Sequence, residues 1–288
     1  MVTLNTHNAQ CYICGGTKCC IIKKEAAWNV IQCKDCSFVY ITPVPSEQFL
    51  HLHYQQYLPS DSIHIEQWRI MMTNIFLRSI NIIEARHSLG RGALLDIGCG
   101  YGFFLELARQ RGWNVYGIEP CAHARAYAAS KGIAVDSENL FTRAYSDEMF
   151  DVVTLFYVLE HLPEPLRYLK EINRILKPGG LLLIRVPHIT PLVKFLKIFR
   201  IPNKLYDSPS HLSDFSPRTM ALALEKTGFC EINTFPGGAT RPRAIGQRII
   251  SYGSGVLADL LYFISWKRLL MPGVSKTTIA SKNGVRDA

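Results

Sequence analysis

Apolar and polar positions follow two different periods along the chain, and the change of period predicts its elements. From residue 93 onward, short apolar runs typical of buried strands alternate with segments whose apolar residues recur at helical spacing. The predicted strands are 93–97, 115–118, 133–135, 151–156, 181–186, 229–235 and 277–281, and the predicted helices are 103–111, 122–131, 165–176 and 217–227, with residues 177–180 closing the third helix. This order predicts an α/β fold with a doubly wound, mostly parallel seven-stranded sheet and helices on both faces.

The first 92 residues have a different pattern. Residues 29–33 and 37–41 are short β-like runs in a Cys-rich segment, and the prolines that follow disfavour both helix and central strand. Residues 46–58 and 62–88 then look helical. We therefore expect a small domain at 1–45, a helical linker or lid at 46–92, and a main domain at 93–288 with a helical insertion at about 240–273.

Composition narrows the class of protein. Of the 288 residues, 48% are hydrophobic and 19% are charged, which permits a sizeable core and excludes disorder of the whole chain. No apolar run approaches the roughly 20 residues of a membrane span. The first residues lack the basic start and apolar centre of a secretory signal, so we expect a cytoplasmic protein whose 9 cysteines are thiols or metal ligands.

The net charge of +9 is concentrated near the C-terminus, because residues 191–288 hold 14 Lys and Arg against 6 Asp and Glu. Such a region suits an acidic acceptor, an anionic membrane or nucleic acid, and a solvated face explains it equally well. The segments 191–204 and 241–276 mix basic, aromatic and aliphatic residues. They predict either a helical cap packed on the sheet or helices lying on the inner face of a membrane.

A glycine-rich turn carries the strongest chemical signal. Gly98, Gly100 and Gly102 follow the first strand of the main domain in a G-x-G-x-G pattern, which differs from the G-x-G-x-x-G of dinucleotide binders. Asp96, at the end of that strand, disfavours a pyrophosphate and suits a ligand that is cationic at this point. Glu119 ends the next strand, where a carboxylate can accept hydrogen bonds from both hydroxyls of a ribose.

With these motifs the chain resembles the class I S-adenosylmethionine-dependent methyltransferases. The resemblance continues in order through residues 150–163, 169–180, 211–217 and 228–229, and so covers residues 93–235. It implies a methyl transfer from S-adenosylmethionine, with cofactor contacts at the carboxyl ends of the strands. It implies that Asp96, Gly98, Cys99 and Gly100 line the amino-acid half of the cofactor and that Glu119 holds the ribose. Glu138 or Asn139 would face the adenine, and Phe156 and Tyr157 would flank the methionine portion.

Four cysteines form a second strong motif. Cys11-x-x-Cys14 and Cys33-x-x-Cys36 are separated by 18 residues, a spacing that predicts a closed, structural zinc site of four thiolates. Incidental core cysteines and a redox dithiol are the alternatives. The segment also resembles an N-terminal zinc ribbon found in a subset of these methyltransferases, some of which methylate nucleotide-linked deoxysugars, other natural products or cell-surface glycans. Tyr54 and Tyr57 are candidates for a lid over the site, or for buried packing.

Methyl transfer needs an aligned acceptor and in some cases a base near the strand ends. His161 and His211 are the catalytic candidates, with His188 a weaker one, and proximity without a base is also compatible with the sequence. The predicted acceptor is a small molecule, a sugar or a lipid-linked glycan. The alternative is an RNA methyltransferase that holds nucleic acid with the ribbon and the basic C-terminal third. Against RNA, residues 155–158 are not an N-P-P-Y-type tetrapeptide. A non-catalytic cofactor-binding paralogue is a third option.

Overall fold

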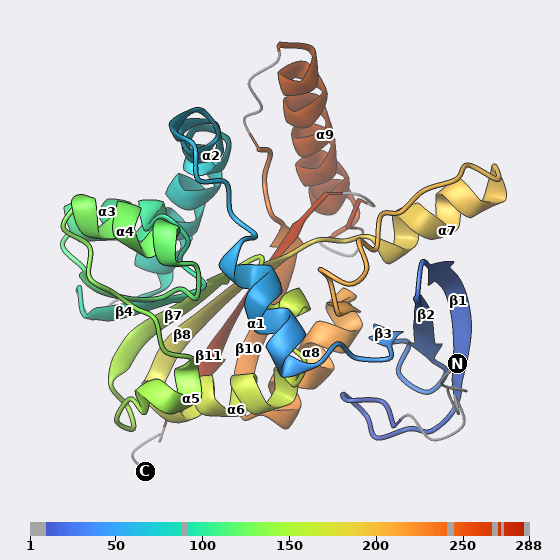
Figure 1. The fold of residues 1–288 in the computed structure, drawn as a ribbon, viewed down its shortest axis with the longest axis horizontal. Coiled ribbons are helices and arrows are strands. Elements are labelled where there is room, and N and C mark those ends of the chain that lie inside the picture. The colour runs from blue at the N-terminus through green and yellow to red at the C-terminus, as the bar shows by residue number, and fades with distance from the viewer. Residues whose placement is uncertain (1–9, 88–90, 241–244, 267–269, 272–273, 285–288) are drawn as a thin grey trace.

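A seven-stranded sheet forms the centre of the protein in the computed structural model, which describes residues 10–87, 91–240, 245–266, 270–271 and 274–284 (Figure 1). Its strands are β4 (Ala93–Ile97), β5 (Asn114–Ile118), β6 (Val135–Asp136), β7 (Phe150–Phe156), β8 (Leu176–Val186), β10 (Phe229–Pro236) and β11 (Lys276–Lys282). The order is β10-β11-β8-β7-β4-β5-β6, and β11 runs antiparallel to both of its neighbours. The predicted doubly wound, mostly parallel fold is confirmed.

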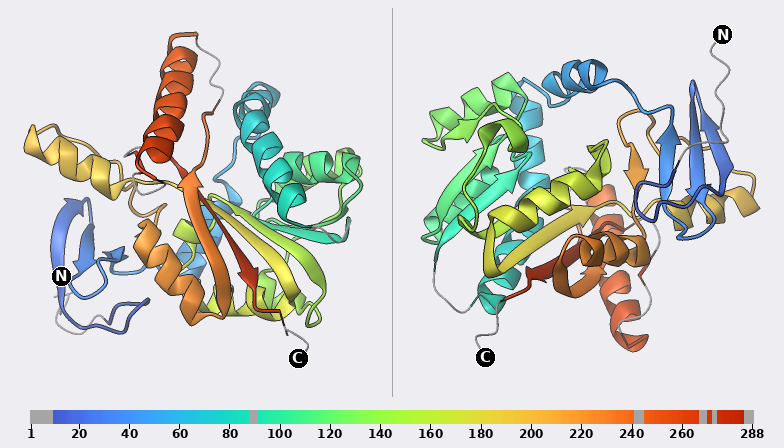
Figure 2. Two further views of the ribbon diagram at one scale, coloured as in Figure 1. Left: turned by 180° about the vertical axis from the view of Figure 1, so that it is seen from behind. Right: turned by 90° about the horizontal axis from the view of Figure 1, so that it is seen from below.

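Helices cover both faces of this sheet (Figure 2). Because side chains alternate along a strand, Leu94, Val152 and Leu183 join one core, and their neighbours Leu95 and Val153 join the other. The first core is closed by α2 (Ser62–Arg86), α3 (Phe103–Gln110) and α4 (Ala122–Ser130). The second is closed by α5 (Leu140–Arg143), α6 (Pro165–Ile175) and α8 (Pro217–Lys226).

A second, antiparallel sheet lies at the N-terminal side of the molecule (Figure 1). Its order is β1 (Cys19–Glu25), β2 (Trp28–Cys33), β3 (Val39–Thr42) and β9 (Ser213–Asp214). The last of these strands belongs to the main body, directly before α8. The rings of Phe38 and Phe215 lie 5.0 Å apart, and the Nζ of Lys226 donates to the carbonyl of Ile13 at 2.8 Å. The N-terminal sheet is therefore completed by, and packed against, the main body.

The remaining helices connect or extend these two sheets. The helix α1 (Glu47–Gln55) and a short link lead into α2, and η2 (Leu159–His161) follows β7. The helix α7 (Thr190–Ile198) follows β8, and α9 (Ile245–Ile264) lies between β10 and β11; both project from the body (Figure 1). Within the described residues, no helix combines the length and the hydropathy that a membrane crossing requires.

The structure differs from the predicted elements in several places. Residues 177–180 do not close α6 but belong to β8, because Leu176 already pairs with Phe150 before the register shifts. The strand predicted at 133–135 begins two residues later, as Val135–Asp136. Ile133 cannot join it because its N–H is bonded to a carbonyl near the end of α4. The predicted helix 62–88 ends at Arg86, and its last residue lies outside the described ones. The strand β1 and the helix α5 were not predicted, because their apolar residues are too few or too briefly periodic. The helix α7 lies in the segment 191–204, which was expected to be helical, and it begins one residue earlier than that segment.

Candidate functional site

The glycine turn links β4 to α3 through three backbone positions in the left-handed region. Gly98, Gly100 and Gly102 have φ of 69°, 54° and 75°, which non-glycine residues rarely adopt. A Cβ on Gly98 would lie 2.4 Å from the Cγ2 of Val158, so a side chain cannot fit there. The amide of Gly98 donates to the carbonyl of Ile118 at 2.8 Å, which holds the turn against the end of β5. The backbone of this turn is thus fixed in a conformation that glycine adopts readily and other residues do not.

Glu119 lies directly after β5 and faces the glycine turn. Its Oε2 accepts from the amide of Gly100 and its Oε1 from the amide of Cys121, both at 2.9 Å. Burial, with 5% of the residue exposed, raises the pKa of Glu119, and the two amide hydrogen bonds oppose that rise. Each carboxylate oxygen has a further lone pair, so this side chain can also accept from two ligand hydroxyls.

Asp96 lies at the end of β4, below the turn, with 2% of its surface exposed. Its Oδ1 accepts from the Oγ1 of Thr154 at 2.7 Å. Burial is the main reason why the pKa of Asp96 rises to about 8, and the nearby charge of Glu119 adds to it. The carboxyl is therefore neutral at neutral pH, and a cation beside it would favour its ionised form.

The residues predicted for the adenine lie on the far side of Glu119. The amide of Glu119 donates to the carbonyl of Asp136 at 3.0 Å, which brings the loop after β6 alongside. Glu138 and Asn139 are both exposed in this loop. The Oδ1 of Asn139 caps α5 by accepting from the amide of Phe141 at 2.9 Å, so this oxygen is already engaged.

Phe156 and Tyr157 end β7 and have different surroundings. Phe156 is buried between the rings of Phe76 and Phe104, at 5.1 Å and 4.8 Å. Tyr157 has a φ of 58°, and its hydroxyl accepts from the Nε of Arg185 at 2.7 Å. Arg185 is 1% exposed and also donates to the carbonyl of Gly237. Sequence reasoning missed this anchoring residue, although a single charge in an apolar strand was the available signal.

A short segment between α1 and α2 lies over the glycine turn. A Cβ on Gly100 would lie 3.6 Å from the Cδ1 of Leu58. The carbonyl of Leu58 accepts from the Nε2 of His123 at 2.9 Å, and the hydroxyl of Tyr101 donates to the carbonyl of Pro59. These bonds attach the helical linker to the elements that carry the turn.

The two histidines predicted as catalytic candidates lie together. The rings of His161 and His211 are 4.9 Å apart, and the rings of Tyr54 and Tyr57 lie 5.3 Å and 5.6 Å from that of His161. The Nδ1 of His161 is 2.7 Å from the carbonyl of Ser210 and must carry the proton, so Nε2 keeps its lone pair. Aromatic rings from α1 and from the residues just after it thus border a histidine pair at the strand ends.

Burial keeps these imidazoles neutral. It lowers the pKa of His161 to about 3, with a smaller contribution from His211, and it also lowers the pKa of His211. His188 is buried too, which lowers its pKa to about 4, but its ring is hydrogen-bonded to the backbone of Met271. The two clustered histidines therefore have neutral rings at physiological pH.

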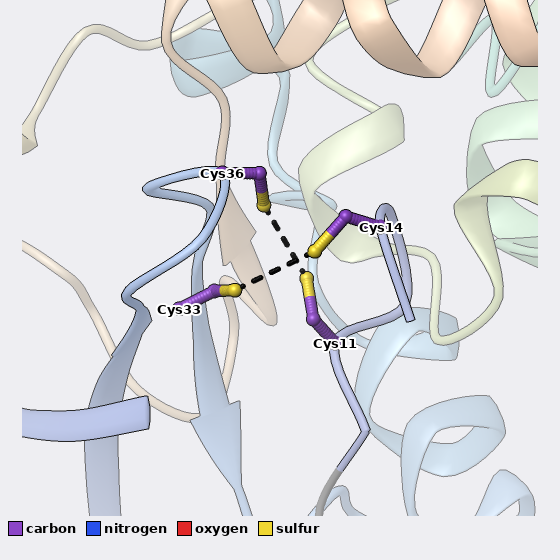
Figure 3. A group of neighbouring side chains, drawn as sticks. All are labelled: Cys11, Cys14, Cys33 and Cys36. Atoms are coloured by element: carbon purple, nitrogen blue, oxygen red, sulfur yellow. Dashed lines mark hydrogen bonds between the residues drawn. The ribbon is translucent and has the colours of Figure 1, made fainter. Parts of the chain in front are cut away.

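The four N-terminal cysteines converge on one point (Figure 3). The sulfurs of Cys11 and Cys36 lie 3.5 Å apart, those of Cys14 and Cys33 3.6 Å apart, and all four lie within 4.8 Å of one another. A tetrahedral ion with Zn–S bonds of about 2.3 Å holds its sulfurs roughly 3.8 Å apart. The spacing of the thiols therefore fits such an ion.

The N-terminal sheet also supports the histidine pair. Tyr40 in β3 pairs with Ser213 in β9, and the amide of Ile41 donates to the carbonyl of Leu212 at 3.0 Å. On its other side, the amide of Leu212 donates to the carbonyl of Glu160 at 2.8 Å. His211 thus precedes a residue that is bonded to both the N-terminal sheet and the segment of His161.

Comparison with solved structures places this fold among the Rossmann-like methyltransferases. An S-adenosylmethionine-dependent methyltransferase from Archaeoglobus fulgidus superposes with a TM-score of 0.53 at 20% identity, covering 77% of this chain and 100% of that one. Phosphoethanolamine N-methyltransferase 2 of Haemonchus contortus, solved with S-adenosyl-L-methionine, gives 0.53 at 15% identity over 85% of this chain and 62% of its own. At these identities the likeness is one of fold.

The family follows from the sequence itself. Residues 78–232 match the model of the methyltransferase domain family, so the chain belongs to that family. The predicted resemblance to class I S-adenosylmethionine-dependent methyltransferases is confirmed. A ubiquinone biosynthesis O-methyltransferase of Pseudomonas aeruginosa is 41% identical over 108 residues, which are 35% of this chain and 47% of that protein. The chain thus spans about half the length of the curated relatives it matches.

Proposed function

We propose that this protein is an S-adenosylmethionine-dependent methyltransferase that acts on a hydroxyl of a small-molecule acceptor. The observation that carries the proposal is the pairing of Glu119 with the glycine turn, where one carboxylate oxygen accepts from the amide of Gly100 at 2.9 Å. This arrangement suits a ribose, because Glu119 can accept hydrogen bonds from its hydroxyls and the glycines of the turn have no side chains in the way. Membership of the methyltransferase domain family supports the same donor.

The residues present fit the donor chemically. Glu119 would hold the ribose hydroxyls, and Asp96 with Gly98, Cys99 and Gly100 would surround the amino-acid half. Asp96 suits the ammonium and sulfonium charges of the donor, because a cation beside this buried carboxyl favours its ionised form, whereas a phosphate would not. When bound, S-adenosylmethionine supplies the methyl group and a neutral thioether leaving group.

The acceptor side is proposed at the histidine pair. Tyr54 and Tyr57 offer aromatic contacts there, and Tyr57, which is 46% exposed, carries the edge of the cluster to the surface. The curated relatives are named for O-methylation in ubiquinone biosynthesis, which supports a hydroxyl on a small molecule. Sugar and lipid-linked glycan hydroxyls belong to the same chemical class and stay within the proposal.

Positioning is the main task of the protein in such an in-line displacement. The Tyr54 and Tyr57 rings would orient the acceptor, while the segment at residues 58–59 keeps water from the glycine turn. The Nε2 of His161 has a free lone pair and can accept a hydrogen bond from the hydroxyl, but burial lowers the pKa of this ring to about 3 and makes it a poor base. His211 is the second group that can accept a hydrogen bond from the hydroxyl.

We also propose that the four cysteines hold a structural zinc ion. Four thiolates close its coordination sphere, so the ion would stabilise the N-terminal sheet without taking part in the reaction. Because β9 completes that sheet, the ion would indirectly fix the position of His211.

Peripheral contact with an anionic membrane is proposed for the two projecting helices. On α7, Phe195 and Ile198 are exposed beside the exposed Lys194 and Lys197, and the exposed Phe199 follows directly after the helix. This mixture of apolar and basic side chains suits the surface of an anionic bilayer. In a flotation assay, we expect the protein to rise with vesicles that contain phosphatidylglycerol. If the same fraction of protein is recovered with neutral vesicles, the proposal is contradicted.

A labelled donor tests the function. The protein is incubated with S-adenosyl-L-[methyl-³H]methionine and either a small-molecule cell extract or purified RNA. We expect label in the small-molecule fraction, including its lipid-soluble part, and not in RNA. Label recovered in RNA alone, or in neither fraction, would overturn the proposed acceptor class.

A further inference from the structure

A second group of metal-ligand side chains lies beside the proposed acceptor site. One potential ligand atom each from Glu160, His161 and His211 lie within 4.8 Å of one another. In the part of the chain that the structure describes, this group and the four cysteines are the sets with such spacing. Unlike the cysteines, it combines a carboxylate with two imidazoles, which leaves coordination positions open.

The carboxylate of Glu160 lacks any protein partner among the described residues. Glu160 is 1% exposed, and neither its Oε1 nor its Oε2 has a hydrogen bond. Two buried cations lie in its field, but the Nζ of Lys276 donates to the carbonyl of Pro187 at 2.6 Å and Arg185 donates to Tyr157. A buried carboxyl group whose two oxygens make no hydrogen bond is costly, and a bound cation would satisfy both oxygens.

Both histidines are oriented as metal ligands usually are. The Nδ1–H of His161 donates to the carbonyl of Ser210, and the ring of His211 is hydrogen-bonded to the backbone of Tyr206. One nitrogen of each ring is thereby anchored, and the other is left with a lone pair. Anchoring the second nitrogen on a backbone carbonyl fixes the tautomer and the direction of a ligating imidazole.

We propose that Glu160, His161 and His211 bind one divalent first-row metal ion, whose open positions take the hydroxyl of the acceptor. This inference rests on the proposed function for the role of the ion, but not for its binding. Coordination would lower the pKa of the hydroxyl, which loses its proton to solvent. The oxygen then forms a bond to the methyl carbon as the carbon–sulfur bond breaks, giving the methyl ether, S-adenosylhomocysteine and one released proton.

Manganese is the probe for this site, because Mn²⁺ prefers carboxylate and water ligands and is a poor competitor for four thiolates. Protein purified with its zinc in place is titrated with MnCl₂, and the free ion is followed by electron paramagnetic resonance. We expect one bound ion per chain and a rise in melting temperature with added Mn²⁺. Glu160→Gln and His211→Gln should each weaken binding by about 30-fold or more, in line with the loss of one ligand of three.

Melting of the metal-free variants separates a ligand from a structural residue. If Glu160 is a ligand, the metal-free Glu160→Gln protein melts at the same temperature or higher, because the substitution breaks no hydrogen bond of the carboxyl group within the protein. Glu225→Gln, an exposed change on α8, is the matched control and should bind Mn²⁺ normally. Failure of the unmodified protein to bind Mn²⁺, or equal binding by all variants, overturns the metal site.

Calorimetry with S-adenosylmethionine on the same samples keeps the two proposals apart. Donor binding without Mn²⁺ binding overturns the metal site and leaves the methyltransferase proposal standing. Mn²⁺ binding without donor binding overturns the methyltransferase proposal and leaves the metal site standing.

Discussion

The cofactor half and the acceptor half of this site are built in opposite ways. Asp96, the three glycines and Glu119 lie within one continuous stretch of chain, at the ends of two adjacent strands. Tyr54, His161 and His211 come from three distant segments and meet only in the folded protein. The first half is therefore encoded locally, whereas the second depends on tertiary structure, including the N-terminal sheet.

This difference predicts which half of the site a given substitution affects. A change in the four-cysteine cluster should disturb the acceptor half through β3, β9 and His211, because these strands belong to the N-terminal sheet. The glycine turn instead follows β4 of the main sheet and is bonded to the end of β5. A change in the turn should affect donor binding directly. The predictions below separate the two halves.

The largest effect is expected from loss of the thiolate cluster. Cys36→Ser removes one of the four ligands, and because structural zinc contributes on the order of 10 kcal/mol to small metal domains, we expect a stability loss of at least about 4 kcal/mol. Urea unfolding measures it, with zinc content determined by elemental analysis. Cys20→Ser, exposed and outside the cluster, is the control and should be nearly neutral.

Donor affinity sharpens this comparison. At a temperature where the Cys36→Ser protein stays folded, its affinity for S-adenosylmethionine should change by less than about threefold, because no cofactor contact is touched. Equal stability of the two cysteine variants, or a native protein without zinc, would contradict the structural role of the cluster.

A smaller effect is expected from the glycine turn. Gly98→Ala combines a φ of 69° with a Cβ placed 2.4 Å from Val158, so strain and overlap together should cost about 3 kcal/mol. Gly179→Ala has a similar φ of 74° but no atom within 4 Å, so it should cost about 1 kcal/mol. Thermal melts compare the two. If they lose equal stability, the close contact with Val158 is not what requires glycine at position 98.

The turn and the cysteine motif could be predicted because their signals are local. Three glycines after an apolar strand, an acid at the end of the next strand, and two C-x-x-C pairs are visible in the sequence without knowledge of the fold. The succession of strands and helices along the chain followed from the alternation of apolar runs with helical patterns. These parts of the sheet agree with the structure apart from shifts of one to a few residues at strand ends.

The acceptor half could be predicted only in part. His161 and His211 were singled out separately, but no periodicity shows that a two-residue strand, β9, joins the N-terminal sheet and sets their distance. The cover formed by Leu58 and Pro59, and the anchoring of Tyr157 by Arg185, depend on the same kind of long-range contact. A single sequence can mark a residue such as Arg185 as unusual, but it does not show which distant residue that side chain contacts.

The smallest predicted effect is a pH dependence of donor binding. The pKa of Asp96 is about 8 because the side chain is buried, so the carboxyl is protonated below that pH in the free protein. A cationic donor favours the ionised form, and binding then releases a proton. Affinity should therefore rise with pH, by up to about tenfold per unit, and level off above the pKa. Calorimetry in buffers of different ionisation heat measures the proton release.

Asp96→Asn is the variant that tests this linkage. It cannot ionise, so its affinity for S-adenosylmethionine should be lower and nearly independent of pH between about 6 and 9. An unchanged pH profile in this variant would show that another group is responsible.

The most direct test of the cofactor half is calorimetric titration of Glu119→Ala with S-adenosylmethionine, beside Glu225→Ala as a matched surface control. Each hydrogen bond to a charged group contributes about 1.5–3 kcal/mol, so loss of two should weaken binding by about 100-fold or more. We predict one site per chain in the unmodified protein and in Glu225→Ala, and a loss of that size in Glu119→Ala. Equal affinity in all three proteins would contradict the assignment of the donor to the glycine turn.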